Sequence, residues 1–92
     1  MTNAPTIALG DARVGFRGRI LALDMSRAPG TGLPSEELER RLLELGFVEG
    51  AEVELLHEGL FGRDPIALKV DDMRVALRRR EAASLIIRRV AA

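Results

Sequence analysis

The stretch SEELERRLLELGFVEG, residues 35–50, contains the start, the buried face and the end of one helix. Ser35 is predicted to cap the N-terminus, and the glutamates that follow it lie in the first turn, where the helix dipole favours negative charge. Gly46 stands where a residue of left-handed conformation ends a helix. The apolar stripe between these ends recurs at helical spacing and comprises Leu38, Leu42 and Leu45.

On both sides of this helix, apolar residues alternate with polar ones, which predicts strands. Asp71-Asp72 joins two such runs and predicts a tight hairpin. The predicted strands are residues 19–23, 52–58, 66–70, 73–77 and 85–90, with a short helical turn over 79–84. This order predicts a mainly-β fold, a small five-stranded SH3-like barrel with the α-helix between its first two strands and the helical turn before its last strand.

The chain of 92 residues provides room for one domain. Residues 1–8 are predicted to be a flexible N-terminal leader, because they hold few apolar side chains, and residues 9–92 are predicted to form the domain. The absence of cysteine excludes disulfides, thiolate metal sites and cysteine nucleophiles. Since the sequence has no apolar run of about 20 residues and no signal-like start, we expect a cytoplasmic protein that is not inserted in a membrane.

The sequence contains no arrangement that is typical of catalysis, and we expect that the chain is not an enzyme. Its serines have no histidine at a recognisable spacing, and its glycines are too loosely spaced for a phosphate-binding loop. The formal net charge is +0, which argues against a general nucleic-acid binder, because such domains are usually strongly basic. These observations favour a binding module over an enzyme.

His57 is the only histidine and the weak candidate for a metal ligand. In a regular strand it shares a face with Val53 and Leu55 while Glu58 points the opposite way, which favours a packed histidine near one end of the barrel. Asp71-Asp72 supplies fewer oxygens than a dedicated Ca²⁺ site uses. We therefore assign no metal site, and weak binding of a divalent transition metal such as Fe²⁺ is left open.

Leu60 and Phe61 stand at the tip of a glycine-flanked loop between two predicted strands. An apolar pair at such a tip lowers solubility and is typical of a contact surface. The alternative interpretation is that this loop folds back and covers the mouth of the barrel.

Residues 41–50, RLLELGFVEG, resemble the R-L-x-x-L-G-hydrophobic-x-x-G signature of the FeoA family, the small accessory proteins of bacterial ferrous iron transport. Other motifs of this family occur in the family's order, and together with the signature they cover residues 9–90. They are G-x-x-G-x-I at Gly15, Gly18 and Ile20, G-D-P-I at Gly62, Asp64, Pro65 and Ile66 with Arg63 inserted, and A-L-R-x-x-E-A at residues 76–82.

This resemblance implies an SH3-like barrel and a cytosolic accessory protein that acts by protein–protein interaction with the membrane transporter FeoB. We interpret one set of residues in these motifs as structural, namely Leu42, Leu45, Gly46, Gly50, Asp64 and Pro65. For contact with the transporter we predict a groove between the helix and the apolar loop, comprising Leu60, Phe61, Arg41, Glu44 and Phe47.

The same type of domain occurs at the C-terminus of iron- and manganese-dependent repressors. The first alternative is therefore a metal-responsive regulatory domain that binds Fe²⁺ or Mn²⁺ and acts through dimerisation. A weaker hypothesis is an SH3-like RNA-binding module, because Arg78-Arg79-Arg80 form a basic cluster. The lack of tryptophan and tyrosine removes stacking platforms for single strands, so no nucleic-acid partner is expected, and a homo-oligomer is left open.

Overall fold

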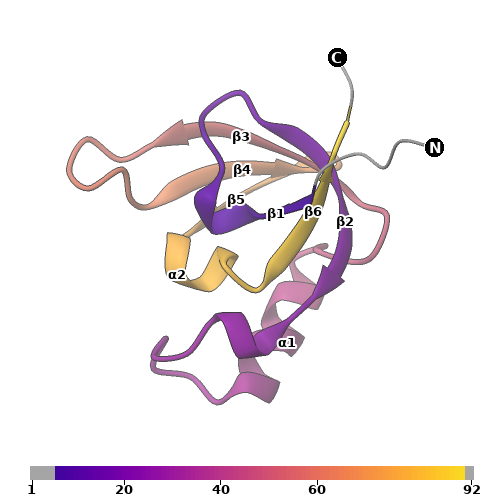
Figure 1. The fold of residues 1–92 in the computed structure, drawn as a ribbon, viewed down its shortest axis with the longest axis vertical. Helices are drawn as coiled ribbons and strands as arrows, with labels where there is room; N and C mark the ends of the chain where they lie inside the picture. Colours follow the sequence, from indigo (N-terminus) through magenta and orange to yellow (C-terminus); the bar gives the residue numbers. More distant parts are fainter. Residues whose placement is uncertain (1–5, 91–92) are drawn as a thin grey trace.

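The computed structural model describes residues 6–90, which form an antiparallel sheet of six strands in the order β1-β6-β2-β3-β4-β5 (Figure 1). The strands are β1 (Thr6–Ala8), β2 (Arg17–Leu23), β3 (Glu52–Glu58), β4 (Ile66–Val70), β5 (Met73–Leu77) and β6 (Leu85–Arg89). The helices are α1 (Ser35–Glu44), α2 (Arg79–Ala82) and the short 3₁₀ helices η1 (Leu9–Asp11) and η2 (Met25–Arg27).

The predicted strand count of five is wrong, because β1 adds a sixth strand within the segment predicted to be flexible. Thr6, Ile7 and Ala8 pair with residues 86–88 of β6. The predicted leader of residues 1–8 therefore does not extend to Ala8, and its first five residues lie outside the described part of the chain. Within residues 6–90, β1 and β5 form the two edges of the sheet without pairing with each other, so the predicted barrel is an open sheet.

The hydrophobic core is one cluster of buried residues that come from the strands, from η1, α1 and α2, and from the segments that connect them. The helix buries Leu38 and Leu42, as the apolar stripe predicts. Strand β4 alternates between buried and more accessible residues, which places Ile66, Leu68 and Val70 on the core side. The largest side chain among the fully buried residues is Phe47, which lies three residues after the end of α1. Helix α1 is therefore held in place both by its stripe and by Phe47.

The end of α1 follows the prediction, whereas its start does not. Gly46 has a φ of +105° and donates its N–H to the carbonyl oxygen of Leu43 at 3.0 Å. Phe47 donates its N–H to the carbonyl oxygen of Leu42, also at 3.0 Å, which completes a Schellman motif. Ser35 is the first helical residue and not the cap, because Pro34 occupies the capping position and makes no side-chain hydrogen bond there.

Strand β3 contains a bulge that reverses the orientation of its last residues. Leu55 pairs with Leu68, but the next pair is His57 with Ala67, so Leu56 is an extra residue on this strand. A one-residue insertion exchanges the two faces for every residue that follows. His57 is therefore exposed and does not share the buried face of Leu55, which corrects the prediction from regular alternation.

Strand β6, the last in the chain, lies between β1 and β2 in the sheet. Its pairing with β2 brings the backbone of Arg88 and the side chain of Ile87 so close to Gly18 that a Cβ there has no space. The hairpin between β4 and β5 is confirmed, because Val70 pairs with Met73 across Asp71-Asp72. The predicted helical turn before β6 is also confirmed, as helix α2.

Candidate functional site

The loop between β3 and β4, residues 59–65, projects from one end of the sheet (left in Figure 1). Leu60 is 94% exposed and Phe61 is 90% exposed, and we call this pair the loop tip. Side chains that covered the mouth of a barrel would lose most of their accessible surface. The interpretation in which the loop folds back is therefore wrong, and the loop tip is an apolar projection into solvent.

The base of this loop is hydrogen-bonded to Arg79, the first residue of α2. The side chain of Arg79 donates from Nε to the carbonyl oxygen of Arg63 at 2.8 Å and from Nη2 to Glu58 Oε1 at 2.9 Å. Its backbone N–H donates to Asp64 Oδ1 at 2.9 Å. Gly59 then closes the loop by donating its N–H to the carbonyl oxygen of Pro65 at 2.9 Å.

The other nitrogen of the same guanidinium reaches the N-terminal part of the chain. Arg79 Nη1 donates to the carbonyl oxygens of Gly10 at 3.1 Å and Ala12 at 2.7 Å. The Arg79 side chain is 17% exposed, so this charge is largely removed from water and depends on its partners. Arg79 therefore joins η1, α2 and the loop base, and it holds the segment that carries the loop tip.

The bulge at Leu56 makes part of this arrangement possible. Glu58 pairs with the buried Ile66 and turns toward Arg79, although regular alternation would place it on the outer face. Its Oε1 also accepts a hydrogen bond from Arg63 Nε at 3.3 Å. One carboxylate thus binds two arginines at the base of the loop.

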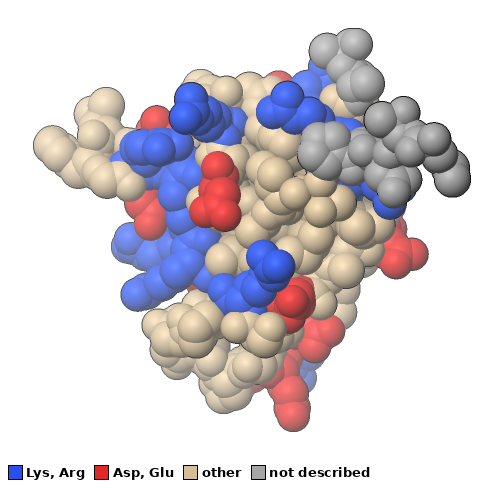
Figure 2. Space-filling view, in the orientation of Figure 1, with Lys and Arg blue, Asp and Glu red and all other residues tan. Residues whose placement is uncertain are grey.

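Arginine side chains face solvent beside the loop tip. Arg63, Arg78 and Arg80 are exposed, and we call them the arginine surface. Carboxylates lie near them: Glu58 binds Arg79 and Arg63, Asp64 accepts from the Arg79 backbone, and Glu81 accepts from the Arg78 N–H at 2.9 Å. Figure 2 shows Lys and Arg gathered over α2 and at the base of the projecting loop.

The structure does not form the predicted groove between the helix and this loop. Arg41 and Glu44 are exposed on α1, but α1 (bottom of Figure 1) lies apart from the β3–β4 loop. Phe47 is 0% exposed and therefore cannot contact a partner without unfolding. The exposed apolar residues near α1 are Leu43 and Val48, and with Arg41 and Glu44 we call them the helix surface.

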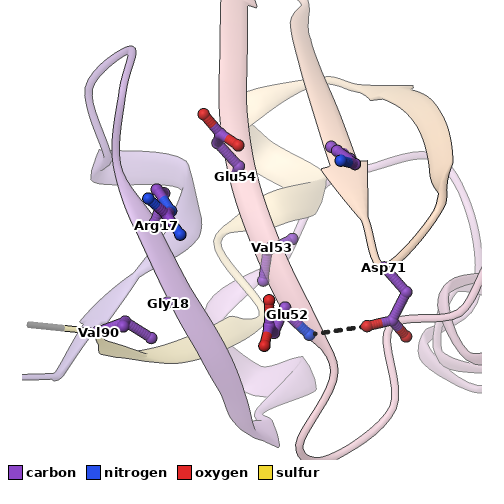
Figure 3. A pocket seen from close by; sticks show the side chains of 8 residues that line it. Arg17, Gly18, Glu52, Val53, Glu54, Asp71 and Val90 are labelled. Carbon is purple, nitrogen blue, oxygen red and sulfur yellow. Dashed lines mark hydrogen bonds between the residues drawn. The ribbon is translucent and has the colours of Figure 1, made fainter. Parts of the chain in front are cut away.

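A separate pocket of about 170 Å³ lies over β2, β3 and β4 (Figure 3). Arg17 pairs with Glu54 across β2 and β3, and Glu54 pairs with Lys69 across β3 and β4, so opposite charges stand next to each other. Asp71 Oδ1 at its rim accepts the backbone N–H of Glu52 at 3.2 Å. The charged lining residues are two cations, Arg17 and Lys69, and three carboxylates, Glu52, Glu54 and Asp71, and the lining includes no serine, threonine, cysteine or histidine.

The residues present do not fit a metal ion. In the described part of the chain, no three His, Cys, Asp or Glu side chains lie close enough to hold one. His57 is exposed on β3, and Asp71 uses its carboxylate to accept from Glu52. We therefore derive no step through a bound metal.

The residues interpreted as structural lie at turns and in the core. Leu42 is fully buried, Leu45 is half-buried, and Gly46 and Gly50 have φ angles of +105° and +86°. Asp64 binds the Arg79 backbone instead of its own turn. Arg79 itself occupies an unspecified position in the motif at residues 76–82, so sequence reasoning had no signal for its central role.

Comparison with known proteins identifies a protein family that matches this chain. The FeoA domain model matches residues 7–89. No curated protein is similar enough in sequence to be matched. In the part of the chain that the structure describes, no helix is long and apolar enough to cross a membrane.

Solved structures with the same fold include FeoA from Stenotrophomonas maltophilia in complex with zinc, described as a procaryotic SH3 domain protein. It is 30% identical over 91% of this chain and 89% of that chain, with a TM-score of 0.67. FeoA from Chlorobium tepidum is 27% identical over 92% of this chain and 71% of that chain, with a TM-score of 0.73.

A manganese-dependent transcriptional repressor bound to manganese has a TM-score of 0.75 over 94% of this chain and 37% of that chain. Its identity of 16% shows a shared fold and nothing more. The family model, in contrast, spans all six strands and both α-helices. The chain therefore belongs to the FeoA family of ferrous iron transport accessory proteins, whose fold is SH3-like.

Proposed function

We propose that this chain is a cytoplasmic accessory protein of bacterial ferrous iron uptake that acts by binding the cytosolic part of a FeoB-type transporter. The observation that carries the proposal is the family match over residues 7–89. The Stenotrophomonas relative supports it, because that protein is described as a candidate activating factor of bacterial ferrous iron transport.

Two of the exposed apolar regions of the described surface are candidates for this contact. The loop tip exposes Leu60 and Phe61, and the helix surface exposes Leu43 and Val48, which are 41% and 44% accessible. Exposed apolar side chains beside charged ones are typical of protein contact surfaces. The role of Arg41 and Glu44 would be to set orientation at the rim of the helix surface.

The test is recovery of the transporter from iron-limited cells with a tagged chain. Wild-type protein is expected to retain a large GTP-binding membrane protein from detergent extracts, and its deletion is expected to reduce uptake of radioactive ferrous iron. Leu43→Ser with Val48→Ser tests the helix surface, and Leu60→Ser with Phe61→Ser tests the loop tip. Failure to recover any transporter, with uptake unchanged in both double variants, would reject the proposal.

Metal-responsive regulation, the first alternative from the sequence, is not proposed as a second function. The likeness to the manganese-dependent repressor concerns the fold alone. The zinc is a property of the Stenotrophomonas structure, and residues 6–90 of this chain bring no three His, Cys, Asp or Glu side chains together.

A further inference from the structure

We infer that the loop tip and the arginine surface bind the anionic lipid surface of a membrane, with Leu60 and Phe61 entering the bilayer and Arg63, Arg78 and Arg80 contacting phosphate headgroups. This inference goes beyond the proposed function and does not depend on it. It assigns the loop tip to lipid and leaves the helix surface for the transporter.

The shape of the loop tip favours lipid over a protein partner. Leu60 and Phe61 are 94% and 90% exposed in the β3–β4 loop, which projects from one end of the sheet (Figure 1). A protein partner must supply a complementary pocket and a surrounding rim that excludes water. The boundary between headgroups and acyl chains accepts an apolar projection without such a pocket.

The charges around the loop tip match an anionic surface. Arg63, at the base of the loop, has a side chain that is 55% exposed, and Arg78 and Arg80 flank Arg79, which is bonded to that base. Glu58 is shared between Arg79 and Arg63, and Glu81 accepts the backbone N–H of Arg78. Arg78 and Arg80 expose their guanidinium groups to solvent beside these carboxylates, and each arginine near an anionic bilayer strengthens binding by roughly fivefold.

The positions of the loop tip and the arginine surface also fit the order of layers in a bilayer, in which the phosphate headgroups lie outside the acyl chains. The apolar pair belongs to the β3–β4 loop, which projects from one end of the sheet, and Figure 2 shows Lys and Arg at the base of this loop and over α2, with Asp and Glu among them. Arginine stems can extend along apolar surface while their guanidinium groups remain among the phosphates. We therefore expect Leu60 and Phe61 to enter the bilayer until the arginine surface reaches the phosphate headgroups.

Hydrogen bonds at the loop base lower the cost of insertion. Arg79 binds the carbonyl oxygen of Arg63 and the carboxylate of Asp64, and Gly59 donates to Pro65. A segment that is already ordered loses less conformational entropy when it binds. The loop tip is thus presented in one arrangement before any lipid is present.

The chain contains no tryptophan, so one substitution provides a clean probe. Phe61→Trp places the sole indole at the loop tip, and Val48→Trp places it on the helix surface as a matched control. Transporter-free vesicles of phosphatidylglycerol in phosphatidylcholine are expected to shift the emission of Phe61→Trp to shorter wavelength and to expose it to quenching by brominated acyl chains. The emission of Val48→Trp is expected to stay unchanged.

Cosedimentation with the same vesicles measures the two components separately. Leu60→Ser with Phe61→Ser is expected to weaken binding by at least tenfold, because it removes both inserted side chains, whereas Leu43→Ser with Val48→Ser leaves it unchanged. Arg78→Gln with Arg80→Gln is expected to weaken binding by roughly tenfold or more, against no change for Arg40→Gln with Arg41→Gln. High salt or pure phosphatidylcholine is expected to abolish most of the binding.

Two results would overturn this inference. One is a wild-type chain that does not cosediment with anionic vesicles at low salt and a Phe61→Trp emission that they do not shift. The other is an emission shift that occurs only with vesicles containing the transporter, which would make the partner of the loop tip a protein. Because the lipid test uses no transporter, its failure leaves the proposed transporter contact standing.

Discussion

Arg79 Nη1 donates a hydrogen bond of 2.7 Å to the carbonyl oxygen of Ala12, a residue 67 positions earlier in the chain. The same guanidinium binds Glu58 and the carbonyl oxygen of Arg63. A single side chain therefore connects the N-terminal segment, the short helix α2 and the base of the projecting loop. The contribution of Arg79 to the free energy of unfolding can be measured separately from that of the exposed arginines beside it.

Arg79→Gln is expected to lower the free energy of unfolding by about 2–4 kcal/mol, because it removes a largely buried charge and its hydrogen bonds to three carbonyl oxygens, and it leaves Glu58 with Arg63 as its remaining partner. Arg79→Lys is expected to recover little of this loss, since one ammonium group cannot reach partners on three segments. Urea unfolding measures the free energy of unfolding of both variants. Arg80→Gln, at an exposed position, serves as the control, and an equal loss in Arg80→Gln would contradict the assignment.

Phe47 and Phe61 provide a matched pair of aromatic substitutions. Phe47→Ala is expected to cost about 3–5 kcal/mol, because this side chain is fully buried against the core. Phe61→Ala is expected to change stability by no more than about 0.5 kcal/mol, because the side chain is 90% exposed. Thermal and urea unfolding of the two variants check this contrast, and comparable losses would show that the loop tip packs on the protein in solution.

Gly46→Ala tests backbone strain without a steric clash. The φ of +105° is unfavourable for any L-residue with a side chain, whereas the nearest atoms to an added Cβ are those of Val70 at 3.8 Å, an ordinary contact distance. We expect a loss of about 1–2 kcal/mol in urea unfolding, with α1 retained in circular dichroism. Glu49→Ala, on the exposed turn that follows, is the control and is expected to have little effect.

Asp24 is expected to make the stability of the fold depend on pH, because its pKa is shifted in the folded protein. The hydroxyl of Ser26 donates to Asp24 Oδ1 at 2.6 Å and, with the Ser26 N–H and the nearby Arg27, holds the pKa of Asp24 below its usual range. A lowered pKa in the folded state means that this contribution to stability is present above the unfolded pKa and is lost as pH falls through the folded pKa. Carboxyl-carbon NMR titration measures the value directly.

Ser26→Ala is expected to raise the pKa of Asp24 toward the usual value, because it removes the strongest of the hydrogen bonds that stabilise the carboxylate. Ser35→Ala, on α1, is expected to leave the titration of Asp24 unchanged. A pKa that is the same in wild-type protein and Ser26→Ala would show that Arg27 and the backbone account for the shift.

Features decided by neighbouring residues could be predicted from the sequence. The end of α1 depends on Gly46 and the leucines before it, and the β4–β5 hairpin depends on Asp71-Asp72 between two alternating runs. Strand β1 could not be found in this way. It has three residues, too few to show alternation, and it is defined by pairing with β6 at the other end of the chain.

Only those features of the candidate site that depend on neighbouring residues could be predicted from the sequence. The position of Leu60 and Phe61 at the tip of a glycine-flanked loop is local information, but the sequence does not decide whether that loop projects or folds back, and only the exposure of the pair shows that it projects. The predicted groove required α1 and the loop to meet, and that depends on the path of the whole sheet. The bulge at Leu56 likewise exchanged the faces of His57 and Glu58, and no residue in β3 indicates it.

The position of β6 has a consequence for biosynthesis. Residues 85–89 are made after the other five strands of the sheet, yet they pair with β1 on one side and with β2 on the other, so that Ile20 stands opposite Ile87. While these residues are still inside the ribosome, the first two strands lack the neighbour that joins them. The six-stranded sheet therefore forms only after β6 has left the ribosome, and a nascent chain that stalls before residue 85 leaves β1 and β2 without their shared partner.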